Sequence, residues 1–295
     1  MILALAAAGC ASPDGGQADT VLPTGTPIPE TVPAPLPVPQ PRRSHTLTAV
    51  GPHELLMTGG LTYVANSAAW LGDTWTFSTL HGTWDQSGNV SVRGQHTVAT
   101  SGDTTLLFGG YAGTDFVYGD LRELVFDDWI DIVDAARPSA RTGAVMAYDA
   151  ESELFVLFGG DVSPFDARLP TNETWVLSSA TGRWELRSPD ISPQPKSEGH
   201  PTLFELALVY HEAADRLLLL IGGDELWAYD TDTDTWEERT APGLDADYMV
   251  AAAYHAGIDR LITYGGAPTG RTAETWSYDY AADAWQLIET RNSPG

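Results

Sequence analysis

The stretch Leu154-Phe155-Val156-Leu157-Phe158-Gly159-Gly160, followed by tryptophans at 175 and 184, decides the fold because the rest of the chain repeats it. Four more apolar runs end in a glycine pair, at Gly59-Gly60, Gly109-Gly110, Gly222-Gly223 and Gly265-Gly266. Successive pairs lie 50, 50, 63 and 43 residues apart. Four of the five pairs are followed by two tryptophans nine residues apart, namely Trp75/Trp84, Trp175/Trp184, Trp227/Trp236 and Trp276/Trp285. A period of this length indicates repeated supersecondary units.

Each unit divides into four short strands. The first precedes the apolar run, the second ends at the glycine pair, the third carries the first tryptophan, and the second tryptophan opens the fourth. One such sheet cannot bury both of its faces, so neighbouring copies must stack, and a radial arrangement leaves only short, protected edges. The sequence therefore predicts an all-β propeller of about five four-stranded blades over residues 42–295, with repeats at about 42–90, 91–138, 139–190, 200–242 and 246–290.

The second repeat departs from this pattern. Val125 is expected at its first tryptophan position, and Trp129 comes early. This predicts a shortened turn at Asp127-Asp128 between the third and fourth strands.

The repeats resemble the kelch repeat, which has an Arg-x-x-His approach, a double glycine and a spaced aromatic pair. Arg42-Arg43-Ser44-His45 and Arg93-Gly94-Gln95-His96 match the approach, and Arg141-Thr142-Gly143-Ala144 matches apart from the final His. The fourth and fifth repeats lack it, with Leu203/Leu206 and Asp247/Val250 there. The resemblance covers about residues 41–290 and implies a kelch-type β-propeller. His45 and His96 recur at matching positions, which favours a packing role over catalysis.

Composition excludes several functions. The 295-residue chain has 40 acidic and 15 basic residues, a formal charge of −25 at pH 7, which makes nucleic acid and anionic membrane surfaces unlikely ligands. A single cysteine excludes an internal disulfide and a thiolate zinc site. We expect no metal and no cofactor. Asp230-Thr231-Asp232-Thr233-Asp234 invites a calcium site, but Thr235 and Ala241 occupy the Gly and Glu positions of an EF-hand, which favours an acidic turn.

The first 41 residues indicate export and display. Residues 1–9 are a short apolar run ending in Ala7-Ala8-Gly9 before Cys10, which is typical of a signal peptide. The segment resembles a bacterial lipoprotein signal, which implies a lipid on Cys10; the alternative is an ordinary signal peptide in which Cys10 is incidental. Residues 10–41 carry prolines at 23, 27, 29, 33, 35, 37, 39 and 41 and predict an extended linker. We expect a monomer in the bacterial cell envelope or on its surface, anchored only through this lipid, or secreted without it.

The candidate site lies on one face of the propeller. Loops that enter the first strand and loops that leave the second must open on the same side of an antiparallel sheet. This places Arg42, Arg93 and Arg141 with the long loops 61–72, 111–119 and 161–172. Long loops on a rigid scaffold often carry function. Candidate ligand-binding residues are these three arginines with Tyr63, Trp70, Tyr111, Asp115, Phe116, Asp161, Phe165 and Arg168. The alternative for the arginines is structural, as partners of carboxylates or carbonyls that hold the blades together.

Two functions remain open. The first is a non-catalytic recognition module that binds a protein or a carbohydrate through this face. The second is a sugar-modifying enzyme resembling the sialic acid mutarotases, which would use an arginine-lined mouth. No catalytic residue can be assigned, since a propeller brings together residues about 50 positions apart. Arginines that converge on an open pocket would favour the enzyme, and arginines buried in salt bridges would favour the module.

Overall fold

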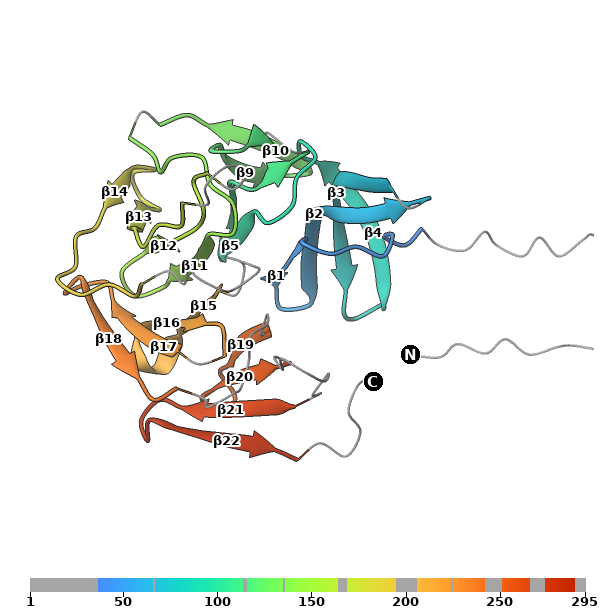
Figure 1. Cartoon of the computed structure of the whole chain (residues 1–295). Coiled ribbons are helices and arrows are strands. Elements are labelled where there is room, and N and C mark those ends of the chain that lie inside the picture. Colours follow the sequence, from blue (N-terminus) through green and yellow to red (C-terminus); the bar gives the residue numbers. More distant parts are fainter. Residues whose placement is uncertain are drawn as a thin grey trace, which may run out of the picture. The chain divides into compact units, whose positions relative to one another are not determined.

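The computed structural model describes residues 37–65, 67–113, 116–134, 136–163, 169–194, 206–223, 225–241, 251–265 and 274–289. They form five four-stranded antiparallel sheets in a propeller arrangement, each sheet made from one continuous part of the chain (Figure 1). The expected all-β fold with five four-stranded blades is confirmed. The predicted signal, Cys10 and most of the linker lie outside the described residues.

The strands follow the repeats in order. Blade 1 contains β1 (Thr46–Gly51), β2 (Glu54–Val64), β3 (Ser67–Ser78) and β4 (Thr83–Asn89). Blade 2 contains β5 (Thr97–Ser101), β6 (Thr104–Phe108), β9 (Leu121–Val125) and β10 (Asp128–Ile132). Blade 3 contains β11 (Val145–Asp149), β12 (Leu154–Phe158), β13 (Thr174–Ser178) and β14 (Trp184–Leu186).

Blade 4 contains β15 (Leu206–His211), β16 (Arg216–Ile221), β17 (Glu225–Asp230) and β18 (Thr235–Arg239). Blade 5 contains β19 (Ala251–His255), β20 (Arg260–Tyr264), β21 (Thr275–Asp279) and β22 (Ala284–Ile288). The first strands of the five blades together line a central channel of about 760 Å³. In the described part of the chain, no helix is long and apolar enough to cross a membrane.

The second strand of blade 3, β12, is apolar throughout because both of its faces are buried. In β12, Phe155 and Leu157 pack toward blade 2, whereas Val156 and Phe158 pack toward blade 4. Successive side chains of a strand point to opposite faces, so a strand between two neighbouring sheets has no polar side. This is the physical reason for the continuous apolar runs in the sequence.

Apolar clusters join the blades in chain order. Among the described residues, four clusters link blade 1 to 2, blade 2 to 3, blade 3 to 4 and blade 4 to 5. None of these four clusters contains residues of both blade 5 and blade 1. The second strand of blade 5, β20, accordingly alternates half-buried and buried residues, in contrast to β12 and β16, which are buried after their first residue.

The region expected as a long loop in blade 1 is instead a β-hairpin. The strands β2 and β3 continue past the glycine pair, and their pairing extends to Val64 opposite Ser67. A register shift between Thr58 and Gly60 lets the hairpin change direction at the glycines. In blade 2 the corresponding segment forms a small sheet of β7 (Tyr111–Ala112) and β8 (Phe116–Val117).

The expected alignment of the second repeat is corrected by the strand register. Arg122 pairs with Leu107 just as Trp175 pairs with Leu157, so Arg122 and not Val125 stands at the first tryptophan position. The turn is short as predicted, but it lies at Phe126-Asp127 and not at Asp127-Asp128, since β9 ends at Val125 and β10 begins at Asp128.

Candidate ligand-binding face

The Arg-x-x-His segments enter the first strands and join neighbouring blades around the mouth of the channel. The third residue of each segment has a positive φ, of 57° at Ser44, 53° at Gln95 and 69° at Gly143. The amide of Gln95 donates to the carbonyl of Ser44 at 3.0 Å, and the amide of Gly143 donates to that of Gln95 at 2.9 Å. These bonds run from blade 1 through blade 2 to blade 3. The motif therefore builds the rim of the channel.

The glycine pairs make room for this rim. At Gly110, φ is 93° and an added Cβ would lie 2.8 Å from the carbonyl oxygen of Gly94. The amide of Gly110 also makes a hydrogen bond between blades, because it donates to the carbonyl of Arg141 at 2.9 Å. Only glycine combines this backbone conformation with so close an approach.

The side chain of Arg93 is enclosed by its own blade. Its Nη1 and Nη2 donate to the two carboxylate oxygens of Asp120 at 2.7 and 2.8 Å, and Nη1 also donates to the carbonyl of Gly109 at 3.0 Å. The ring of Tyr118 covers the guanidinium at 3.8 Å. The backbone of Arg93 meanwhile bonds to Gly60 and Leu71 of blade 1. Arg93 thus ties two blades together.

Arg42 and Arg141 repeat this arrangement. Arg42 donates to Asp73 at 2.6 and 2.8 Å and to the carbonyl of Gly59 at 3.0 Å. Arg141 donates to Glu173 at 2.6 Å and to the carbonyl of Gly159 at 3.0 Å. The side chains of Arg42, Arg93 and Arg141 are 2%, 0% and 0% exposed. This placement supports the structural alternative for the three arginines.

The acidic partners are held in the charged form. Burial alone would raise the pKa of Asp120, but the hydrogen bonds and charges of Arg93 and Arg122 outweigh it and lower the pKa below the ordinary value. The pKa of Asp73 is lowered in the same way by Arg42 and Trp75, against the effect of burial. Glu173 follows the same pattern, with a pKa lowered by Trp175 and Arg141. The ion pairs are therefore intact at neutral pH.

The mouth of the channel is a cavity of about 470 Å³ that we call the rim pocket. The side chains that line it come from blades 1 to 4 and are Arg43, Ser44, His45, Leu61, Gln95, His96, Tyr111, Ala144, Val145 and Leu206, together with Gly143. Its cation is Arg43, the neighbour of Arg42. Adjacent residues in an extended chain point to opposite sides, so burial of Arg42 accompanies exposure of Arg43 toward the mouth.

Of the predicted aromatic residues, Tyr111 lines this pocket, and Tyr63 and Trp70 each contact one of its lining residues. Arg43 donates to the hydroxyl of Tyr63 at 2.6 Å, and its guanidinium lies 5.2 Å from the ring centroid. Trp70 packs edge-to-face on Tyr111 with the ring centroids 4.6 Å apart. Burial raises the pKa of Tyr111, an effect that the charge of Arg43 opposes. Tyr63 is 57% exposed, so this corner of the rim presents an aromatic ring and a cation to solvent.

The histidines of the rim are neutral. Burial lowers the pKa of His96 to about 3, helped by the charges of Arg93 and His45. Burial and the charge of Arg42 also lower the pKa of His45. The Nε2 of His96 lies 3.1 Å from Thr46 Oγ1 of blade 1. This contact agrees with the packing role expected from the repeat.

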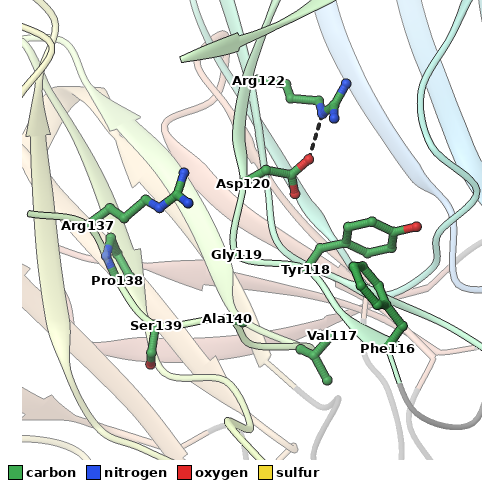
Figure 2. A pocket seen from close by; sticks show the side chains of 10 residues that line it. All are labelled: Phe116, Val117, Tyr118, Gly119, Asp120, Arg122, Arg137, Pro138, Ser139 and Ala140. Carbon is green, nitrogen blue, oxygen red and sulfur yellow. Dashed lines mark hydrogen bonds and ion pairs between the residues drawn. The ribbon is translucent and has the colours of Figure 1, made fainter. Parts of the chain in front are cut away.

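A second cavity of about 570 Å³, which we call the side pocket, lies between Phe116–Arg122 of blade 2 and Arg137–Ala140 at the entry to blade 3. Figure 2 shows Arg137 on one side and Phe116 and Tyr118 on the other. Of the predicted residues only Phe116 lies here, and it packs edge-to-face on Tyr118 at 4.6 Å. The pocket opens on the same face as the rim, because both of its segments belong to connections on that side.

Asp161 is buried and forms hydrogen bonds within its own loop. Its Oδ1 accepts hydrogen bonds from the amides of Ser163 and Leu169, both at 2.9 Å, and its backbone pairs with Thr142. The predicted residues Asp115, Phe165 and Arg168 lie outside the described residues, as do Asp224 and residues 267–273 of the shorter loops.

Sequence reasoning missed Arg43, Arg122 and Arg137. The signal for Arg122 was present, because Asp120 precedes it by two residues just as Asp73, Glu173, Glu225 and Glu274 precede the first tryptophans. In those repeats the tryptophan Nε1 donates to the acid, and in blade 2 the Nε of Arg122 donates to Asp120 at 2.6 Å. Nothing in the sequence distinguished Arg43 or Arg137.

The Asp-rich segment 230–234 forms the hairpin turn between β17 and β18. Asp230 accepts bonds from the amides of Asp232 and Thr233, and it pairs with Arg216 at 2.6 Å. Asp234 accepts from the hydroxyl of Tyr229 at 2.6 Å. No three His, Cys, Asp or Glu side chains in the described ranges are grouped so that they could hold a metal ion. These contacts agree with an acidic turn.

No protein-family model matches the chain, and no curated protein matches it.

Proposed function

We propose that the protein is a non-catalytic recognition module that binds a protein partner at the rim pocket. The five-bladed propeller fits a protein-binding module. The single observation that carries the site is the exposed Tyr63–Arg43 pair at the mouth of the channel. Aromatic and arginine side chains at the centre of a concave surface are the residues that most often dominate protein interfaces.

The arginines of the repeat support the binding module over the sugar-modifying enzyme. A sugar-acid enzyme of the expected kind needs Arg42, Arg93 and Arg141 to face its substrate. Their guanidiniums are instead engaged by Asp73, Asp120 and Glu173 inside the blades. Exposing Arg42 or Arg93 would leave a largely buried carboxylate without its partner, at a cost of about 3–5 kcal/mol. A carbohydrate ligand at Tyr63 is the remaining alternative, and the experiment below distinguishes it.

The proposals of a kelch-type repeat and of a lipid anchor rest on the sequence. The glycine pairs, the Arg-x-x-His approach and the spaced tryptophans favour a kelch-type repeat. The apolar run before Cys10 and the Pro-rich stretch to Pro41 favour a lipid-anchored protein held outside the cytoplasm. If so, Cys10→Ser releases the protein from the membrane fraction of cells. Unchanged membrane fractionation of that variant would overturn the lipid anchor.

The rim pocket is tested by immobilising the full chain and identifying the proteins that it captures. The unchanged protein is compared with R43A/Y63A and with L80A/R183A, which alters exposed residues in the turns at the opposite ends of the strands. The proposal predicts a protein that is retained by the unchanged chain and the control and lost from R43A/Y63A. If R43A/Y63A retains the same proteins as the control, the rim is not the site. Binding of the chain to a glycan array that depends on Tyr63, without any captured protein, would show that the ligand is a carbohydrate and not a protein.

A further inference from the structure

The side pocket has an excess of positive charge that is unusual for this acidic chain. Two guanidiniums, of Arg122 and Arg137, line it, and the lining contributes one carboxylate, that of Asp120. Both oxygens of Asp120 are already bonded by Arg93, and one of them also by Arg122. The charge of the carboxylate is therefore compensated inside the protein, and Arg137 gives the pocket a net positive charge.

Both of these guanidiniums still have donors to offer. Arg122 uses its Nε on Asp120, and no bond from its two terminal nitrogens is present among the described residues. Arg137 is exposed, and within the same residues its side chain makes no ion pair or hydrogen bond. An unpaired guanidinium presents a planar fork of N–H groups that matches a carboxylate. Arg137 is thus the group at which an anion from outside would bind.

The opposite side of the pocket is apolar and held in place. Phe116 is 55% exposed and packs on Tyr118. Tyr118 is fixed because its hydroxyl donates to the carbonyl of Val92 at 3.1 Å and its ring covers Arg93. Val117 completes this apolar side (Figure 2). A fixed aromatic surface beside a cation suits a ligand that carries an apolar group next to its negative charge.

We infer that the side pocket binds an acidic peptide segment of the protein partner, with an Asp or Glu carboxylate on Arg137 and a neighbouring apolar side chain on Phe116. Sugar hydroxyls would need further hydrogen-bonding groups. Ser139 Oγ accepts a hydrogen bond from Arg141 at 3.0 Å and Asp120 accepts three from Arg93 and Arg122, so few side-chain acceptors remain for sugar hydroxyls and the lining favours a peptide over an acidic sugar. This inference deepens the proposed function, because the side pocket lies on the same face as the rim.

The test uses two pentapeptide probes, acetyl-Ala-Leu-Glu-Leu-Ala-amide and the same peptide with Gln in place of Glu, titrated into the full chain and followed by NMR. We expect the Glu probe to bind about tenfold more tightly than the Gln probe, as a charge-assisted hydrogen bond predicts. The variant R137A is expected to reduce binding of the Glu probe to the level of the Gln probe. The variant F116A is expected to weaken both probes.

The control variants separate this inference from the proposed function. R183A removes an exposed arginine elsewhere and is expected to change neither probe. R43A/Y63A alters the rim and is expected to leave the probes unaffected even where it abolishes partner capture. Equal binding of the Glu and Gln probes, or full binding by R137A, would overturn the inference. Arg137-dependent binding of an oligogalacturonate probe, with no binding of the peptides, would overturn the peptide assignment.

Discussion

The indole Nε1 of Trp236 donates a hydrogen bond to Thr174 Oγ1 of the preceding blade at 3.1 Å. Blades 1 and 2 contain the same pair, with Trp129 donating to Thr74 Oγ1 at 2.9 Å. The threonine comes directly before the first tryptophan of one repeat, and the donor is the second tryptophan of the next. The repeated Thr-Trp pattern is thus explained by a bond between blades.

Where leucine replaces this threonine, the bond changes. Leu121 stands at this position in blade 2, and the Nε1 of Trp184 is buried with no partner in the described part of the chain. Leu226 stands there in blade 4, and Trp285 donates to the carbonyl of Thr240 at 2.8 Å instead. The chain therefore provides its own matched pair of bonded and unbonded tryptophans.

This pair gives a stability prediction. Trp236→Phe removes a buried hydrogen bond, whereas Trp184→Phe removes an N–H group that has no partner. Both rings pack on a phenylalanine, at centroid distances of 5.2 and 5.8 Å, so their packing losses are similar. We expect W236F to lower the free energy of unfolding by about 1–2 kcal/mol more than W184F. Chemical denaturation of the two variants measures the difference, and equal losses would contradict the role of the bond.

The buried arginines give a second prediction. Arg93→Gln leaves Asp120 without its bidentate partner and removes the donor to the carbonyl of Gly109, while the backbone bonds to blade 1 remain. We expect a loss of about 3–5 kcal/mol in the free energy of unfolding. Arg93→Lys is expected to recover little of it, because one ammonium cannot bond Asp120 and the carbonyl of Gly109 in the same geometry. Thermal unfolding tests both variants, and a loss below about 1 kcal/mol for R93Q would refute the structural role.

The histidines give a prediction about acid. The pKa of His96 is about 3 in the folded protein, below its ordinary value of 6.5. The unfolded chain therefore binds a proton below pH 6.5 that the folded protein does not bind. Stability from this group is fully present above pH 6.5 and falls by about 1.4 kcal/mol per pH unit down to about pH 3.

His45 and His211 also have pKa values lowered mainly by burial, and they add to the same slope. Urea unfolding at pH values from 4.5 to 7.5 measures it. In the His96→Gln variant the slope of the unfolding free energy against pH is expected to be smaller by about 1.4 kcal/mol per pH unit, which corresponds to one proton. An unchanged slope in H96Q would show that His96 is protonated in the folded state.

The apolar clusters predict a gradient of local stability. Blade 3 packs against a cluster on each face, whereas the described residues of blade 5 belong only to the cluster with blade 4. Amides of β12 are therefore expected to exchange with deuterium much more slowly than those of β19 and β22. Hydrogen exchange followed by mass spectrometry tests this, and equal protection of blades 3 and 5 would contradict it.

The fold was readable from sequence because each blade repeats the same physical solution. The glycine pairs are required wherever a sheet turns tightly and packs on its neighbour, so they recur in every repeat, and four of the five repeats also carry two tryptophans nine residues apart. The extension of β2 and β3 to Val64 and Ser67 was not predicted, because its residues follow the glycine pair and occur in one repeat only. The alignment of Val125 failed because Arg122 makes the bond that tryptophan makes elsewhere.

The candidate site was less predictable. The face could be deduced from chain direction, but which of two adjacent arginines points to the channel depends on the local backbone. The carbonyl of Gly59 and the carboxylate of Asp73 hold Arg42 inside, and this leaves Arg43 on Tyr63. Arg137 belongs to the side pocket only through its position across the pocket from Phe116, which no sequence pattern encodes.

The measurement that tests the account most directly compares Arg42→Gln with Arg43→Gln in the full chain, by thermal unfolding and by capture of the partner that the unchanged protein retains. The account predicts that R42Q lowers the unfolding temperature by several degrees, about 2–4 °C per kcal/mol lost. It predicts that R43Q unfolds like the unchanged protein and loses the partner. Partner capture by R43Q at the unchanged level, or loss of capture by R42Q at unchanged stability, would contradict it.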